Sequence, residues 1–162
     1  MSLLAFLLLA CTGGPSDTAD TSADTSDTSA CLTDLPAGEM TAIGTDFPDG
    51  SEGVAFSGGV LYVSVPDGVM AYDGAAWRRV ATLEHALGLA GAQGGVLVAD
   101  PGAFTFDGSG DDGRLHYVGA DGRVVTLAQG MPNPNFVLPK EDGGILVSDD
   151  TAVIYEVRGD RV

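Results

Sequence analysis

Positively charged residues are scarce in this sequence. It holds seven Lys and Arg residues against 23 Asp and Glu, and its formal net charge is −16. The few basic residues are scattered and form no patch, so nucleic acid and anionic membrane surfaces are excluded as electrostatic partners. The acidic balance weakly favours the binding of cations, and it also serves solubility.

Cysteine is scarcer still, and only Cys11 and Cys31 are present. Leu8-Leu9-Ala10-Cys11 resembles a bacterial lipoprotein box, in which the cysteine thiol accepts diacylglycerol. The apolar run Met1–Ala10 is too short to cross about 30 Å of hydrocarbon. We therefore predict a signal peptide over residues 1–11, lipid on Cys11, and a lipid-anchored protein on the periplasmic or outer-membrane face of a bacterial envelope. The alternative for Met1–Ala10 is a buried strand.

The segment after Cys11 has almost no apolar residues. Thr12–Ala30 contains no aromatic residue and no Val, Ile or Leu. Such a segment cannot bury enough apolar surface to offset its ordering entropy. We expect a disordered tether over residues 12–37, followed by a domain over residues 38–162. With Cys11 lipidated, Cys31 has no partner in this sequence, and either a free thiol or a missing partner would account for it.

Helical periodicity is also missing, because no window keeps an amphipathic period of 3.6 residues for three turns. Breakers are frequent instead, with 24 Gly and 8 Pro. Asp-Gly pairs, which suit tight hairpin turns because Gly adopts positive φ, begin at Asp49, Asp67, Asp73, Asp107, Asp112, Asp121 and Asp142. Short runs rich in Val, Leu, Tyr and Phe separate them, and the predicted class is all-β.

A sequence pattern typical of strand–turn–strand occurs three times, in Ser51–Val65, Ala86–Asp100 and Pro134–Asp149. We take Leu61, Leu97 and Leu146 as equivalent positions, which are 36 and 49 residues apart. Repeats of this length and type favour a β-propeller of four-stranded antiparallel blades.

About twelve strands are expected, enough for about three blades. The expected strands are Glu39–Gly44, Gly53–Phe56, Val60–Val65, Val69–Tyr72, Trp77–Leu83, Leu87–Ala90, Val96–Ala99, Arg114–Val118, Val124–Leu127, Phe136–Leu138, Ile145–Ser148 and Ala152–Val157. Three blades cannot close a ring, and an open array leaves two apolar faces in water. The chain is then either a fragment, which the abrupt stop favours, or half of an intermolecular propeller.

The first repeat resembles the opening blade of the gluconolactonase-like propellers, the family of senescence marker protein and luciferin-regenerating enzyme. The resemblance rests on Glu52–Phe56, Val60–Ser64 and Val69–Asp73. Gly130–Val137 and Gly144–Asp149 are similar to the later Pro-Asn-Gly blade opening of that family. The similarity covers about residues 45–158, the N-terminal half of a six-bladed protein.

The resemblance implies one divalent cation, most simply Ca²⁺, held by Glu52 and Asn135. The cation would polarise the carbonyl group of a lactone or ester, and a small lactone or sugar-derived ligand is the implied partner. Leu87 stands where the second blade would supply an oxygen ligand, and Phe136 replaces the Gly after Asn135. The aspartate expected as catalytic base would fall beyond Val162, so no catalytic residue is assigned. Glu52 as a solvated turn residue, and Asn135 as a local backbone partner, are the simpler alternatives.

The remaining candidate site residues match no catalytic or metal-binding motif. His85 and His116 each stand alone in the sequence, which favours packing or surface roles. The loops Asp149-Asp150 and Asp107–Asp112 lack the spacing of a calcium motif, and we expect them to be solvated. The leading function is an envelope-anchored, metal-dependent lactone or ester hydrolase when complete. The alternative is a non-catalytic propeller scaffold that binds a ligand or protein, or that forms an oligomer if the chain is not a fragment.

Overall fold

The computed structural model describes residues 42, 50–105 and 107–159, which belong to one compact unit, Ala42–Val162. The expectations for residues 1–11, for residues 12–37, for Cys11 and Cys31, and for nearly all of Glu39–Gly44 lie outside these residues. No helix in the described part of the chain is long and apolar enough to cross a membrane.

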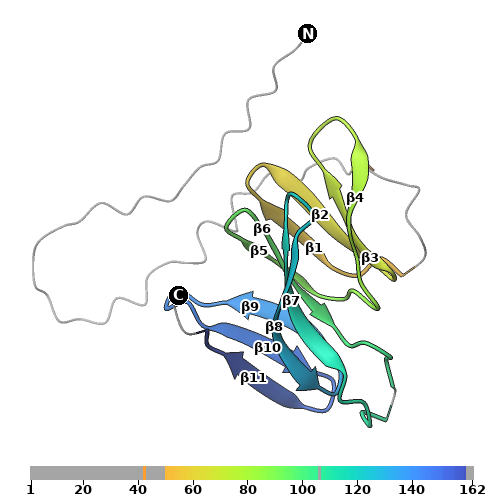
Figure 1. The fold of residues 1–162 in the computed structure, drawn as a ribbon, viewed down its shortest axis with the longest axis vertical. Helices are drawn as coiled ribbons and strands as arrows, with labels where there is room; N and C mark the ends of the chain where they lie inside the picture. Colours follow the sequence, from red (N-terminus) through yellow and green to blue (C-terminus); the bar gives the residue numbers. More distant parts are fainter. Residues whose placement is uncertain (1–41, 43–49, 106, 160–162) are drawn as a thin grey trace, which may run out of the picture. The chain divides into compact units, whose positions relative to one another are not determined.

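The described residues form an all-β structure, as predicted (Figure 1). The eleven strands are β1 (Val54–Ser57), β2 (Val60–Val65), β3 (Gly68–Tyr72), β4 (Trp77–Thr82), β5 (Leu89–Ala92), β6 (Gly95–Asp100), β7 (Gly113–Gly119), β8 (Val124–Met131), β9 (Pro134–Pro139), β10 (Ile145–Asp149) and β11 (Val153–Val157). Each overlaps an expected strand, although the bounds differ, and β5 shares only Leu89 and Ala90 with the expected Leu87–Ala90. The largest difference is β8, which continues past Leu127 because two bulges keep it paired with β7 as far as Met131.

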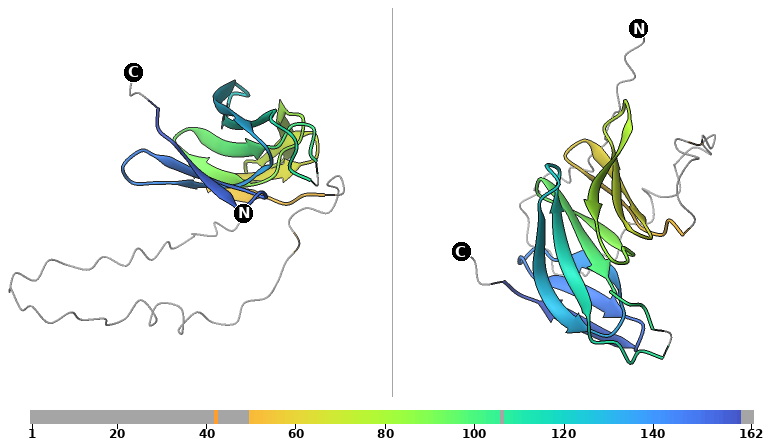
Figure 2. Two further views of the ribbon diagram at one scale, coloured as in Figure 1. Left: turned by 90° about the horizontal axis from the view of Figure 1, so that it is seen from below. Right: turned by 45° about the vertical axis from the view of Figure 1, so that its right-hand side comes forward.

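The strands form three antiparallel sheets in which each strand pairs with its neighbour in sequence. Two sheets have four strands, β1-β2-β3-β4 and β5-β6-β7-β8, and the third contains β9-β10-β11 among the described residues. The two views of Figure 2 show the twisted hairpins that build each sheet.

Two-residue turns set the register of the first two sheets. Ser57 pairs with Val60 across Gly58-Gly59, and Ala92 pairs with Gly95 across Gln93-Gly94. Gly58 and Gly59 have φ values of 57° and 81°, which matches the two positive φ angles of a type I′ turn.

This register corrects one sequence equivalence. The two turns have equal length, so Val60 corresponds to Gly95, and Tyr62, not Leu61, corresponds to Leu97 and Leu146. The first repeat step is therefore 35 residues instead of 36. The shift matters because adjacent strand residues point to opposite faces of a sheet.

The middle sheet packs against a neighbouring sheet on each face, and every residue of β6 is buried, whereas most residues of the outer strand β8 are not. Val96, Val98 and Val118 pack on one face with the β1–β4 sheet, around Tyr62 and Val69. The other face packs against β9–β11 in a second cluster formed by Leu97, Ala99, Leu115, Met131, Val137 and Val147. Each sheet thus buries one face against the next, and this stacking places the starts of β1, β5 and β9 near one another.

Candidate functional site

One pocket collects the residues that open the three sheets. It has a volume of about 350 Å³. Its lining residues are Glu52, which precedes β1; Leu87, which precedes β5; Asn135, which lies at the start of β9; and His85, Phe104 and Asp150. The two sequence-predicted metal ligands, Glu52 and Asn135, therefore line the same pocket, with Leu87 beside them.

Close backbone contacts between sheets produce this convergence. The Gly88 amide donates a hydrogen bond of 2.8 Å to the Asn135 carbonyl. A Cβ atom on Gly88 would collide with that same carbonyl oxygen, and one on Gly53 would collide with the carbonyl of Leu87. Only glycine permits these approaches. The Glu-Gly and Leu-Gly pairs in the sequence are thus the local pattern that brings the sheet openings together.

The polar wall of the pocket contains a side chain that was not predicted as a ligand. The Nδ2 atom of Asn135 donates a 2.8 Å hydrogen bond to Oδ1 of Asp150. This bond engages the amide nitrogen and one carboxylate oxygen, which leaves the Asn135 Oδ1 atom and the Asp150 Oδ2 atom to face other ligands. Asp150 follows β10 directly, at the edge where β9 begins. The adjacent pair Asp149-Asp150 was the only sequence pattern that marked it.

The other lining residues of the pocket, His85, Phe104 and Leu87, are aromatic or apolar. The rings of His85 and Phe104 are tilted by 31°, with centroids 5.8 Å apart. Leu87 is buried, with 5% of its surface exposed. His85 therefore lines a pocket beside an aromatic ring. These residues would bind the carbon skeleton of an organic ligand and contribute no oxygen donor.

Three residues that line the pocket carry oxygen donors of the kind that hard cations prefer. Glu52, Asn135 and Asp150 offer carboxylate and amide oxygens, which Ca²⁺ and Mg²⁺ prefer. Ca²⁺ takes 6–8 oxygens, so water would complete most of the coordination shell. In the part of the chain that the structure describes, no group of three or more His, Cys, Asp or Glu side chains could hold a metal ion. The donor set thus supports modest affinity only.

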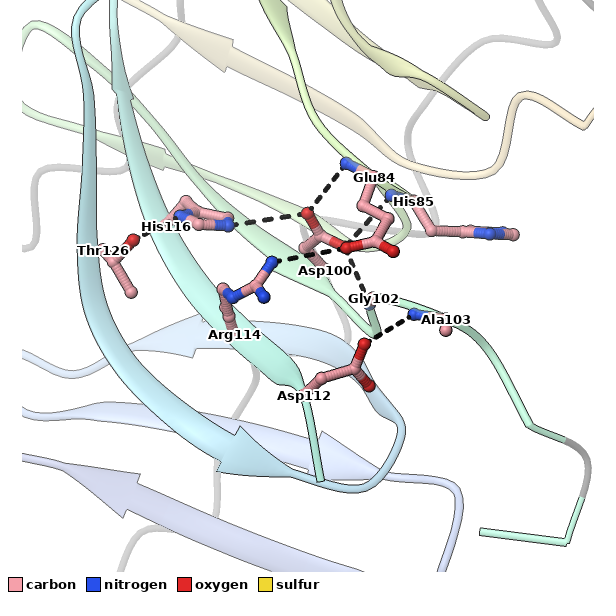
Figure 3. Close-up of polar contacts among 9 residues, drawn as sticks. All are labelled: Glu84, His85, Asp100, Gly102, Ala103, Asp112, Arg114, His116 and Thr126. Carbon is pink, nitrogen blue, oxygen red and sulfur yellow. Dashed lines mark hydrogen bonds and ion pairs between the residues drawn. The ribbon is translucent and has the colours of Figure 1, made fainter. Parts of the chain in front are cut away.

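Asp100 fixes the segment that carries His85 (Figure 3). Its carboxylate accepts hydrogen bonds from the backbone amides of Glu84 (3.2 Å), His85 (3.0 Å) and Gly102 (2.8 Å). Burial alone would raise the pKa of Asp100, but the hydrogen bonds from His116 and from the backbone outweigh it and hold the pKa below its usual value. The ionised Asp100 carboxylate thus joins the end of β6 to the linker that leads to β5 through hydrogen bonds.

His116 continues this network away from the linker. Its Nε2 atom lies 3.5 Å from Oδ2 of Asp100, and its Nδ1 atom lies 3.1 Å from Oγ1 of Thr126. The three side chains belong to β6, β7 and β8, so they tie three adjacent strands together. His116 is only 5% exposed, which agrees with the packing role expected for it.

Asp149 is the counterpart of Asp100 in the third sheet, and the expectation of a solvated Asp149 was wrong. Asp149 is 5% exposed and accepts a 2.8 Å hydrogen bond from the backbone amide of Asn133, in the linker before β9. Its other oxygen accepts the amide and the hydroxyl of Thr151. Burial follows from this position at the end of β10, as for Asp100 at the end of β6. Asp150, in contrast, is exposed as expected.

The loop at residues 107–112 uses its carboxylates internally. Asp107 accepts the backbone amide of Ser109, and Asp112 accepts that of Ala103, both at 3.0 Å. These contacts stabilise turns and point to no bound ion.

Comparison with known proteins adds little to this geometry. No family model and no curated protein matches the sequence. Among solved structures, the chain is similar to one described as the computationally designed Ika4 protein, with 12% sequence identity and a TM-score of 0.42. That match covers 74% of this chain and 97% of the designed one, and at this level of similarity it assigns neither family nor function.

Proposed function

We propose that the three sheets are blades of a gluconolactonase-like β-propeller, and that the pocket at their openings binds a divalent cation together with a small lactone or sugar-derived ligand. The observation that carries the proposal is that Glu52, from the opening of the first sheet, and Asn135 and Asp150, from the third, line one pocket. The buried two-sided packing of the middle sheet supports the blade arrangement. Lipid on Cys11 would hold this domain at the bacterial envelope.

The three oxygen-bearing side chains would hold the cation, which when bound would polarise a ligand carbonyl. The His85–Phe104 pair and Leu87 would pack against the carbon skeleton of the ligand and exclude water from one side. The Asp100 carboxylate accepts a hydrogen bond from the His85 amide and so helps to hold the His85 backbone in place.

A second candidate is a non-catalytic binding module. The observation that favours it is the buried Leu87, which occupies the opening of the middle sheet where a further oxygen ligand would strengthen a metal site. In this function the aromatic and apolar lining residues dominate, and ligand binding does not depend on a cation.

Calorimetric titration with Ca²⁺ and Mg²⁺ tests the leading proposal. We expect weak binding that Glu52→Gln and Asp150→Asn each reduce several-fold, because each removes one carboxylate from an already small donor set. Glu141→Gln is the matched control, since Glu141 is an exposed carboxylate in the β9–β10 turn, outside the pocket lining. Equal affinity in all three variants would rule out the cation site.

Ligand binding separates the two candidates. Gluconolactone is titrated by calorimetry with Ca²⁺ present and then with a chelator. Loss of binding in the chelator supports the cation-dependent function, and binding that persists and falls in Phe104→Ala supports the binding module. We expect little or no hydrolysis by this chain in either case, because no catalytic base is assigned to it.

A further inference from the structure

In the part of the chain that the structure describes, two apolar sheet faces carry exposed large side chains. The first, which we name the C-terminal face, belongs to β9–β11 and consists of Phe136, Leu138, Leu146, Ser148 and Ile154, around a hollow of about 180 Å³. The second, the N-terminal face, belongs to β1–β3 and consists of Val54, Phe56, Leu61, Val63 and Met70. The most exposed members are Ile154 (71%), Phe56 (67%) and Phe136 (66%).

Strand register shows that each open face is the counterpart of a buried one. Leu146 takes the place of Tyr62 and Leu97, which are buried against the following sheet. Leu61 takes the place of Val96 and Ile145, which pack against the preceding sheet. The C-terminal face is therefore the kind of surface that receives a following sheet, and the N-terminal face is the kind that docks on a preceding one.

This pairing of surfaces already occurs twice inside the chain, between the first and second sheets and between the second and third. We propose that a second copy of the chain makes it again, with its N-terminal face docked on the C-terminal face of the first copy. A head-to-tail contact covers one face of each type, and two copies that close on each other would hold six sheets, within the usual range for closed propellers.

Charge near the C-terminal face permits this contact despite the net charge of −16. Glu156 pairs with Leu146 across β10 and β11 and so lies on the same face. Its carboxylate binds Lys140 at 2.6 Å and Arg158 at 2.8 Å, and both cations also bind Asp142. Two acids and two bases thus compensate each other at this part of the rim.

One position differs from the internal interfaces. Phe136 occupies the place of Gly53 and Gly88, where the backbone of the following sheet approaches closely. At the Phe136 end of the C-terminal face, the docked copy must therefore lie further from the sheet than in the two internal interfaces. There the ring of Phe136 would make the contact that the backbone at Gly53 and Gly88 makes within the chain. Phe136 thus replaces the Gly of a Pro-Asn-Gly opening in the third sheet, which is the sheet that carries the open C-terminal face.

The proposal is tested by the mass of the full chain in solution, measured by sedimentation equilibrium over a wide concentration range. We expect a reversible species of twice the 16.4 kDa chain mass. Ile154→Asp and Phe56→Asp each place a charge on one face, and each should weaken the pair at least about tenfold. Leu127→Asp is the control, because Leu127 is an exposed apolar residue on β8, outside both faces.

Mixing the two variants identifies the contact as head-to-tail. Ile154→Asp retains an intact N-terminal face, and Phe56→Asp retains an intact C-terminal face, so an equimolar mixture should regain a two-chain species that neither variant forms alone. Circular dichroism spectra equal to that of the unmodified chain show that the variants are folded. A monomer at all concentrations, species that keep growing beyond two chains, or a pair that Phe56→Asp leaves intact would each overturn the proposal.

Discussion

The Asp100 network makes the sharpest prediction about stability. Asp100 is 1% exposed, one carboxylate oxygen accepts the amides of His85 and Gly102, and the other accepts the amide of Glu84 and lies 3.5 Å from His116 Nε2. In Asp100→Asn, an NH₂ group replaces one of these oxygens and faces a backbone N–H group. An unsatisfied buried donor costs about 1–3 kcal/mol, and the remaining bonds lose their charge assistance.

We therefore expect Asp100→Asn to lower the free energy of unfolding by about 2–3 kcal/mol, a large part of the 5–15 kcal/mol typical of a domain. Urea denaturation of the full chain, followed by circular dichroism, measures this loss. Asp121→Asn is the matched control, because Asp121 makes the same kind of carboxylate-to-amide bond, to Arg123, in an exposed turn. It should leave the unfolding midpoint almost unchanged.

The alternative outcome is equally clear. If Asp100→Asn and Asp121→Asn have the same small effect, the carboxylate of Asp100 is not needed to hold the linker before β5. The account of how the sheets are joined would then be refuted.

Three further predictions concern the acid dependence of stability, the close approach at Gly88 and the lipid anchor. The lowered pKa of Asp100 means that its ionised form stabilises the fold above about pH 4, the usual pKa of Asp, and that this contribution is lost as pH falls through the lower folded value; acid titration of stability should therefore be flatter in Asp100→Asn. Gly88→Ala should cost about 2–3 kcal/mol in a urea titration, because its Cβ would meet the Asn135 carbonyl, whereas Gly159→Ala has open space and should be neutral. Labelled palmitate should be incorporated by bacteria expressing the chain and lost in Cys11→Ala; equal labelling of both would refute the lipid anchor.

Local chemistry made the strands predictable. The Asp-Gly and Gly-Gly turns and the short apolar runs between them encode hairpins, because turn φ angles and period-two alternation depend only on neighbouring residues. For the same reason all eleven described strands could be placed from sequence. The error of one residue at Leu61 arose because two apolar residues stand side by side in β2, and only the hairpin pairing shows which of them points toward the next sheet.

The candidate site could be predicted only in part. Glu52 and Asn135 were singled out by the resemblance to the blade openings of gluconolactonase-like propellers, and Leu87 was singled out because it stands at the same place in the second repeat. Asp150 and His85 were not recognisable as pocket residues, because they lie in different connections and meet the others only when the sheets stack. The burial of Asp100 and Asp149 was not predicted for a related reason, since an Asp that ends an apolar run is usually interpreted as the start of a solvated loop.

The sequence by itself therefore determined the class, the turns and the strands of this protein, and it marked the residues that open each repeat. Only the tertiary structure decided which face of each strand is buried, which carboxylates are buried and accept hydrogen bonds from backbone amides, and which line the pocket. The physical reason is that these properties depend on contacts between sheets, and close approaches such as Gly88 to Asn135 join residues 47 positions apart along the chain.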